Sequence, residues 1–370
     1  MSDKLSIPSL DGIRAVSILL VLVSPCGLGK VVPGGLGVTI FFFLSGYLIT
    51  TLMRAEWART GTINIPHFYA RRAFRLAPPL LVTLAIAYAL YFMGLVRGGA
   101  SVEGFLSQLL YFANYYVIFA DNFGQIPYGT GALWSLAVEE HFYIIYPLVM
   151  LMLLAAFPQR RGIVALFAAV CLAVLAWRFY LAAGPHRELR IELGTDTRID
   201  SILYGCITAL LFSPIDESNR GGRMQPSHWG LLGAALLLLL GSVAIRNTYF
   251  KETLRYTMQG IAVAPIFYLS VRFFDQGPFR ILNWAPMRRI GVWSYAIYLI
   301  HHVAAGGLAL HWPWLESRPL LYVLLVLPIS CAYGAAIDRL VDPYFRKLRS
   351  RFRDTPVGHH ARQPELVPSR

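Results

Sequence analysis

Apolar residues in this chain form long, uninterrupted blocks. They show neither the alternation of a half-buried strand nor the one-sided stripe of a soluble helix. Residues 164–175 and 231–240, for example, contain no charged side chain. A helix that is apolar on every side suits lipid, where about 20 residues cross about 30 Å of hydrocarbon. The pattern therefore predicts an all-α, polytopic integral membrane protein.

About ten transmembrane helices are predicted from these blocks, which are 13–29, 36–53, 77–95, 134–156, 163–183, 199–213, 229–245, 256–273, 291–310 and 318–341. A further apolar segment, 105–120, is short and contains Gln108 and Asn114. We interpret it as a non-spanning or re-entrant helix. Composition agrees with the membrane class, because only 14% of the residues are charged, against about 25% in soluble domains.

Basic residues predict the orientation. If the amino terminus is inside and 105–120 does not cross, the inside loops and tail hold twenty Lys and Arg, and the outside loops hold nine. A crossing at 105–120 would move Arg160, Arg161 and the basic tail outside, against the positive-inside rule. We therefore expect both termini in the cytoplasm and a partly disordered tail, 346–370. The net charge of +13 is attributed to orientation and anionic-lipid contacts, and no nucleic-acid partner is predicted.

Arginines at two places are candidates for chemistry, because a charge at membrane depth is costly unless it is paired. Arg14 follows Asp11 at the head of the first block; the alternative is a helix cap with an interface anchor. Arg71, Arg72 and Arg75 have helical i,i+3 and i,i+4 spacings. On a helix they would form a guanidinium cluster suited to phosphate groups. A charge patch that only sets topology remains the alternative.

Carboxylates and histidines supply the other candidates. Trp134 begins an apolar block that contains the adjacent pair Glu139 and Glu140, which would point about 100° apart on a helix. His301 and His302 lie in the middle of a late block. Such histidines act as proton carriers or as hydrogen-bonded structural residues. For the carboxylates, the alternative is a solvated position at the membrane interface.

Other ionisable and sulfur-containing residues give weaker signals. Arg178, Asp200 and Asp338 are buried-charge candidates without a clear role. The cysteines stand singly in apolar stretches and lack metal-ligand spacing; they are Cys26, Cys171, Cys206 and Cys331. We therefore predict neither a metal site nor a disulfide framework.

The chain resembles the acyltransferase-3 family of bacterial membrane enzymes. The resemblance rests on a set of motifs that occur in order between about residue 8 and residue 346. They are Leu10-Asp-Gly-Ile-Arg14-Ala, the run from Gly37 through Ser45-Gly46-Tyr-Leu, Phe68-Tyr-Ala-Arg71-Arg72-Ala-Phe-Arg75, Trp134-Ser-Leu-Ala-Val-Glu139-Glu140, Arg198-Ile-Asp200 through Gly205, Ser294 through His301, and Val341-Asp342-Pro-Tyr-Phe-Arg346.

This resemblance implies a ten-helix domain over 1–345 in the bacterial inner membrane. It implies transfer of an acyl group, usually acetyl, from cytoplasmic acyl-CoA to a hydroxyl of a surface glycan, lipid-linked sugar or small molecule. Acyl-CoA is then the donor substrate, and no bound cofactor is expected. Arg71, Arg72 and Arg75 are expected to meet the CoA phosphates, and Arg14 is expected to belong to the catalytic site.

One position departs from the family pattern. The family has a histidine eleven residues after the first-helix arginine, expected to act as the base, and here that position is Pro25. Proline cannot accept a proton and tends to kink a helix. Three alternatives follow: an impaired enzyme, another base such as His301 or His302, or Cys26 as a nucleophile.

The predicted mechanism is direct acyl transfer, in which a base deprotonates the acceptor hydroxyl as it attacks the thioester. Arg14, Glu139 and His301 are the predicted catalytic residues. The acceptor is expected to enter from outside near Trp134, Glu139 and Glu140. Two alternatives remain: an inactive homologue that only binds acyl-CoA, and a membrane carrier of a small polar or acylated molecule. No protein partner is predicted.

Overall fold

The computed structural model describes residues 7, 9–29, 31–120, 123–157, 159–184, 187–213 and 222–352. Four parts of the predicted charge pattern lie outside the described residues, namely Lys4, Lys30, Arg220 and the tail from 353. In the described part the regular structure is helical, and the only strand-like pairing is an isolated bridge between Gly98 and Pro127. The all-α prediction is confirmed.

Each predicted apolar block overlaps one helix. These helices are α1 (Leu10–Val23), α2 (Gly34–Thr60), α3 (Ile65–Phe92), α6 (Trp134–Ala156), α7 (Arg160–Ala182), α9 (Thr195–Leu211), α10 (Pro226–Ala244), α12 (Arg255–Arg272), α13 (Ala285–His311) and α14 (Pro319–Ala336). Within the described ranges, six helical stretches are long and apolar enough to span a membrane, or seven if α12 and η5 (Gly277–Asn283) form one bent span. The polytopic membrane class is confirmed, whereas ten crossings and cytoplasmic termini stay predictions.

Segment 105–120 forms two short helices, α4 (Val102–Leu109) and α5 (Ala113–Ala120). The chain turns between them at Tyr111, whose φ is 58°. Eight residues of helix extend only about 12 Å, well short of a bilayer core. Gln108 donates to Thr130 Oγ1, and Asn114 donates to the Leu193 carbonyl. The polar residues of this segment therefore bind neighbouring loops, in agreement with a non-spanning segment.

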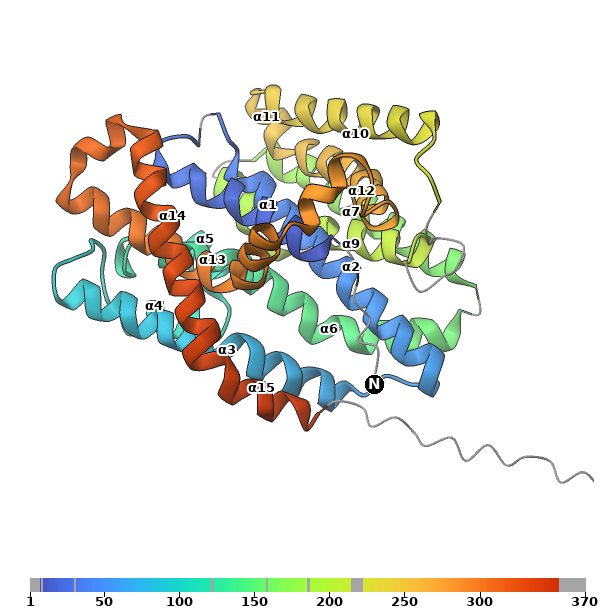
Figure 1. Ribbon diagram of the computed structural model, residues 1–370, viewed down its shortest axis with the longest axis horizontal. Helices are drawn as coiled ribbons and strands as arrows, with labels where there is room; N and C mark the ends of the chain where they lie inside the picture. The colour runs from blue at the N-terminus through green and yellow to red at the C-terminus, as the bar shows by residue number, and fades with distance from the viewer. Residues whose placement is uncertain are drawn as a thin grey trace, which may run out of the picture.

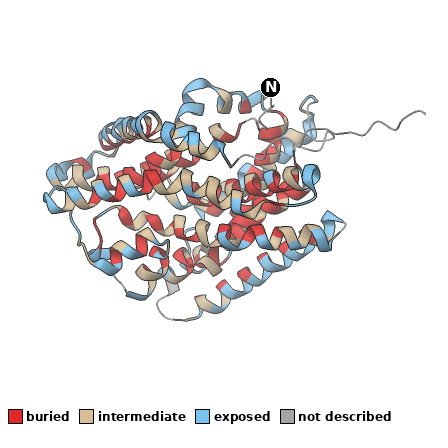
Figure 2. Cartoon of the chain, turned by 90° about the horizontal axis from the view of Figure 1, so that it is seen from below, coloured by how far each residue is buried: buried red, intermediate tan, exposed pale blue. Residues whose placement is uncertain are grey.

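The short helices α1 and α9 lie inside the bundle (Figure 1). Helix α1 packs on α2 and α13, and α9 packs on α2, α7 and α12. Buried residues gather on the inner elements, and exposed residues on the outer ones (Figure 2). Glycines allow the close approach of α2 and α9: a Cβ on Gly46 would lie 2.0 Å from the Ile202 carbonyl oxygen, and one on Gly205 would lie 1.9 Å from that of Phe43. Small residues serve this purpose in membrane bundles.

The carboxyl end of the described chain folds back along α3. Helix α14 continues through a π-helical turn, η7 (Ile337–Val341), into α15 (Asp342–Ser350). Helix α15 packs against α3, as its position in Figure 1 shows. The predicted boundary between a membrane domain and a tail, at 345/346, falls inside this helix. The remaining elements are η1 (Ser24–Cys26), η2 (Phe123–Gln125), η3 (Thr130–Leu133), α8 (Arg187–Leu193), α11 (Thr248–Glu252) and η6 (Pro313–Ser317).

Candidate active site

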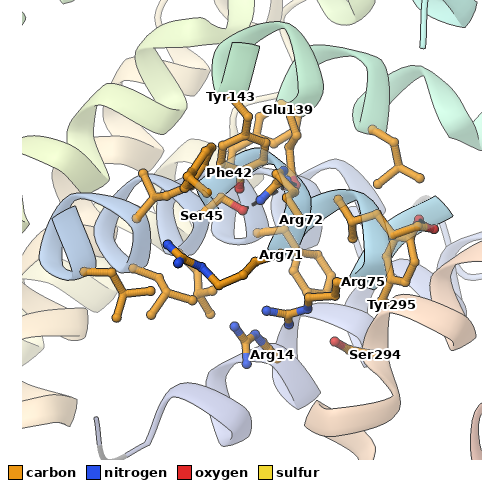
Figure 3. A pocket seen from close by; sticks show the side chains of 18 of the residues that line it. Arg14, Phe42, Ser45, Arg71, Arg72, Arg75, Glu139, Tyr143, Ser294 and Tyr295 are labelled. Carbon is orange, nitrogen blue, oxygen red and sulfur yellow. Dashed lines mark hydrogen bonds and ion pairs between the residues drawn. The ribbon is translucent and has the colours of Figure 1, made fainter. Parts of the chain in front are cut away.

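A cavity of about 500 Å³, here called the arginine pocket, contains most of the predicted cationic residues. Its charged or polar lining comes from α1, α2, α3, α6, α13 and α15: Arg14, Ser45, Glu56, Arg71, Arg72, Arg75, Ser135, Glu139, Tyr143, Ser294, Tyr295, Tyr298, Arg346 and Arg349. Figure 3 shows the guanidinium groups of Arg14, Arg71 and Arg75 pointing into the same space. The structure thus brings together four arginines that the sequence placed in two separate motifs.

Local capping places the α3 arginines at this pocket. Helix α2 ends at Gly61, whose φ of 70° is the left-handed conformation that glycine adopts readily. After a short turn, the Asn64 side chain caps α3 by accepting a hydrogen bond from the His67 backbone amide at 3.0 Å. Arg71 and Arg75 therefore lie one helical turn apart near the start of α3, beside the head of α1.

The arginines differ in how they are paired. Arg14 forms an ion pair with Asp11 at 2.9 Å. Arg71 lies 3.8 Å from a Glu56 carboxylate oxygen and donates to the Phe352 carbonyl at 2.8 Å. No carboxylate among the described residues forms an ion pair with Arg75. This guanidinium is therefore the one best placed to meet an anionic ligand.

Arg72 points the other way, into a network with α6. Its Nε and Nη2 donate to one oxygen of Glu140 at 3.0 and 2.9 Å, and its guanidinium lies 2.9 Å from the centre of the Tyr143 ring. A Glu139 oxygen is 3.9 Å away, and Ser45 Oγ donates to Glu139 at 3.1 Å. Arg72 thus lines the arginine pocket like Arg71, but its guanidinium is engaged with α6.

A second cavity of about 420 Å³, here called the histidine pocket, lies beyond the far end of α1. Its walls include Val21, Ser24, Gly34, Val38, Phe123, Tyr128, Trp134, Glu192, Tyr298, His301 and His302. Ten residues of chain separate Arg14 from Ser24, which in a helix corresponds to about 15 Å. Trp134 thus lies in a different pocket from Glu139, although both were predicted on the acceptor side.

His301 is fully buried, and its ring is oriented by the backbone. Its Nδ1 lies 2.6 Å from the Tyr298 carbonyl oxygen. A carbonyl only accepts hydrogen bonds, so Nδ1 carries the proton. The other nitrogen, Nε2, has no partner among the described residues. His301 thus lines the histidine pocket and carries a buried nitrogen lone pair, and the His302 ring lies 4.7 Å away, centre to centre.

The two pockets meet at Val38 and Tyr298, which line both. The Tyr298 hydroxyl donates to the Ala132 carbonyl at 2.8 Å and lies 2.6 Å from Ser135 Oγ. These bonds hold the tyrosine where the inner ends of the cavities come together. A group brought in beside the arginines can therefore lie close to one brought in beside the histidines.

The sequence led us to expect a kink in α1 at Pro25. Instead, α1 ends before this residue. Helix α1 stops at Val23, and Pro25 lies in the 3-10 turn η1. Its neighbour Ser24 lines the histidine pocket, whereas Pro25 and Cys26 line neither pocket. Proline is tolerated in a first helical turn because the missing N–H has no helical acceptor there. The buried Cys26 therefore contacts no space for a substrate.

The other three charged candidates of the sequence form ion pairs within the protein, and of these Arg178 and Asp200 are buried whereas Asp338 is partly exposed. Arg178 and Asp200, both fully buried, form an ion pair of 2.7 Å between α7 and α9. Asp338 lies 3.2 Å from Arg346. Neither Arg178 nor Asp200 lines a pocket. Their role is structural: they connect α7 and α9 in the part of the bundle that supports α2.

Sequence reasoning gave no role to several side chains of these cavities, including Tyr298, which lines both. Ser45 was part of a recognised motif but carried no predicted role, Glu192 gave no signal, and Arg349 was counted only as a tail charge. The only available signal was the repeat of arginines at 346 and 349, with helical i,i+3 spacing. Their contribution depends on contacts between distant helices.

Comparison with known proteins identifies relatives along nearly the whole chain. The family model of an acyltransferase domain matches residues 7–337. The peptidoglycan O-acetyltransferase OatA of Listeria monocytogenes is 28% identical over 312 residues, covering 80% of this chain and 49% of that protein. The O-acetyltransferase OatA of Staphylococcus aureus is 28% identical over 361 residues, covering 95% and 57%. The chain thus spans about half the length of these relatives. No solved structure matches.

Proposed function

This chain belongs to the acyltransferase family, and from that premise we propose that it transfers an acetyl group from acetyl-CoA to a hydroxyl of a cell-surface glycan. The donor enters the arginine pocket from the cytoplasm, and the acceptor enters the histidine pocket from outside the inner membrane. Peptidoglycan, which the name of the Listeria monocytogenes relative specifies, is the acceptor to test first.

The observation that carries this proposal is the meeting of two chemically different pockets at Tyr298. One pocket has six arginines and two glutamates in its lining, so it favours an anionic ligand. The other offers a histidine base, a carboxylate and aromatic rings, which suit a neutral polyol. An acyl transferase working across a membrane needs this arrangement, because only the acyl carbonyl has to reach the acceptor.

On the donor side, Arg14, Arg71 and Arg75 hold the CoA phosphates, and the pantetheine arm extends inward to Tyr298. Guanidinium groups suit this role because they form bidentate, charge-assisted hydrogen bonds to phosphate. Arg72 has a different part in the proposal. Its bonds to Glu140 and its contact with Tyr143 fix the wall of the pocket and keep Glu139 beside Ser45.

On the acceptor side, His301 takes the role of the family histidine, whose position is occupied here by Pro25. Its Nε2 takes the proton of the acceptor hydroxyl while the hydroxyl oxygen bonds to the thioester carbonyl carbon. The tetrahedral intermediate then breaks its carbon–sulfur bond, and the departing thiolate receives the proton from His301. Ester and free CoA thiol are the products, and the histidine is regenerated.

The test measures CoA thiol release and glycan-bound acetyl, using acetyl-CoA and soluble peptidoglycan fragments with the protein in lipid nanodiscs. His301→Gln should lower the rate by about 10²–10⁴, the usual contribution of a positioned general base. His311→Gln, on the exposed end of the same helix, is the matched control and should leave the rate unchanged. Pro25→His in the His301→Gln background should restore part of the rate, because Pro25 directly follows Ser24, which lines the same cavity as His301.

Three results would refute this assignment. Equal loss of rate in His301→Gln and His311→Gln would mean that activity depends on the intact structure of α13 and not on a base at His301. Binding of acetyl-CoA without any thiol release, in the unsubstituted protein and in Pro25→His alike, would identify an inactive acyl-CoA-binding homologue. Movement of a solute without thiol release would identify a carrier.

A further inference from the structure

Helix α15 lies outside the part of the chain that the family model matches, yet it forms a wall of the arginine pocket. Aromatic rings attach it to α3: Phe74 stacks on Phe345 and Phe352, with ring centres 6.4 and 5.8 Å apart. His67 also contacts Phe352 edge to face. The helix is therefore held in a defined position against α3, next to Arg71.

Two arginines on α15 face the cavity, and both are held by carboxylates of the same segment. Arg349 forms an ion pair with Asp342 at 3.1 Å, and Arg346 contacts Asp342 at 3.5 Å and Asp338 at 3.2 Å. Arg349 is also close enough to Arg75 for their charges to repel. Guanidinium groups gathered in this way gain from an anion between them.

We propose that Arg349, with Arg346, forms a second anion-binding arm that takes the 3′-phosphate of the CoA nucleotide. This inference rests on the proposed function. It follows from the order of groups along the donor: the thioester must reach Tyr298, the pyrophosphate lies further out, and the 3′-phosphate is near the opposite end.

Among the ion-paired arginines that line the pocket, Arg346 is the most exposed. Tyr298 is 6% exposed, the side chains of Arg14, Arg349 and Arg71 are 16%, 19% and 29% exposed, and that of Arg346 is 54% exposed. Arg346 thus lies toward the mouth of the pocket, and Arg349 lies between it and the inner end at Tyr298. The Asp342 carboxylate forms an ion pair with Arg349, and the 3′-phosphate displaces this carboxylate when it binds.

The experiment measures dissociation constants of CoA and 3′-dephospho-CoA by calorimetry, with the protein in phosphatidylcholine nanodiscs. Arg349→Ala should weaken CoA binding about ten- to a hundredfold, as expected for one charge-assisted contact, and leave 3′-dephospho-CoA binding unchanged. Lys347→Ala, on the same helix but outside the pocket lining, is the control and should change neither constant. Arg75→Ala should weaken the binding of both ligands, because it meets the pyrophosphate.

Asp342→Asn separates ligand binding from a purely structural role of α15. If Asp342 competes with the phosphate, this variant should bind CoA at least as tightly as the unsubstituted protein. If the Asp342–Arg349 pair only fastens the helix, the variant should lose affinity as Arg349→Ala does, which would overturn the proposal.

Other outcomes also decide against the proposal. If Arg349→Ala weakened the binding of CoA and 3′-dephospho-CoA equally, α15 would only support the structure of the pocket. Unchanged CoA affinity combined with loss of anionic-lipid binding would assign the arm to a lipid headgroup. Failure of the unsubstituted protein to bind either ligand would remove the donor site itself, and the proposed function with it.

Discussion

The close approach of α2 and α9 at Gly46 and Gly205 offers a sharp test of how the bundle supports the site. Adding a methyl group at Gly46 would place it 2.0 Å from the Ile202 carbonyl oxygen, and adding one at Gly205 would place it 1.9 Å from that of Phe43. Ordinary contacts between such atoms are about 3.5 Å. Because both obstacles are backbone atoms, side-chain rotation cannot relieve them, and α2 and α9 must separate.

We expect Gly46→Ala to lower the free energy of unfolding by about 1–3 kcal/mol, the usual cost of overpacking. Gly205→Ala should have a similar effect. The double variant should cost clearly less than the sum, because one separation of the helices relieves both clashes. Gly233→Ala is the control: its added methyl meets nothing within 4 Å, so it should be neutral or slightly stabilising.

The assay is denaturant or thermal unfolding in one defined nanodisc lipid, with acetyl-CoA-dependent thiol release measured on the same samples. Gly46→Ala should also lower activity, because its neighbour Ser45 binds Glu139 in the arginine pocket. Additive losses in the double variant would show that the two clashes are relieved independently. A Gly46→Ala protein as stable as Gly233→Ala would show that α2 and α9 do not pack this closely.

Two further predictions concern buried charge and topology. Arg178→Met and Asp200→Leu should each lower the free energy of unfolding by about 3–5 kcal/mol, because each leaves an unpaired buried charge. The double variant should lose less stability than the sum of the two. Additive losses in thermal unfolding would contradict the pairing. Single cysteines introduced at Gln125 and Gln159 should be labelled from opposite sides of the membrane, with Gln125 outside. Labelling of both from one side would contradict the predicted orientation.

The helices were predictable from sequence because hydropathy is a local property that lipid imposes on every spanning residue. Helix lengths were less predictable, because helices surrounded by protein need not match the thickness of a bilayer. For example, α1 has 14 residues and α9 has 17. The number of crossings therefore cannot be counted from apolar blocks alone. The break at Tyr111 was not predicted, because the sequence indicated one short helix over 105–120 and the structure has two.

Site residues were predictable only where their spacing along one helix decides which way their side chains point. The i,i+4 spacing of Arg71 and Arg75 correctly placed them at one pocket. Arg72 belongs to the same motif, but its partner Glu140 is 68 residues further along the chain. No local pattern shows which side of α3 meets α6, and the same holds for Arg349 on α15. Spacing therefore indicates which side chains are neighbours along one helix, whereas contacts between helices come only from the structure.

The position of Pro25 illustrates why a motif can be broken without removal of the chemistry. Helices α1 and α13 pack closely, since a Cβ on Gly291 would lie 1.8 Å from the Asp11 carbonyl oxygen. The turn that follows α1 and the middle of α13 border one cavity, where Ser24 and His301 both form part of the wall. An acceptor hydroxyl in that cavity requires a lone pair within hydrogen-bonding reach, and either helix can supply it. In the proposed mechanism, a base on α13 therefore takes the role that a histidine at the end of α1 would otherwise have.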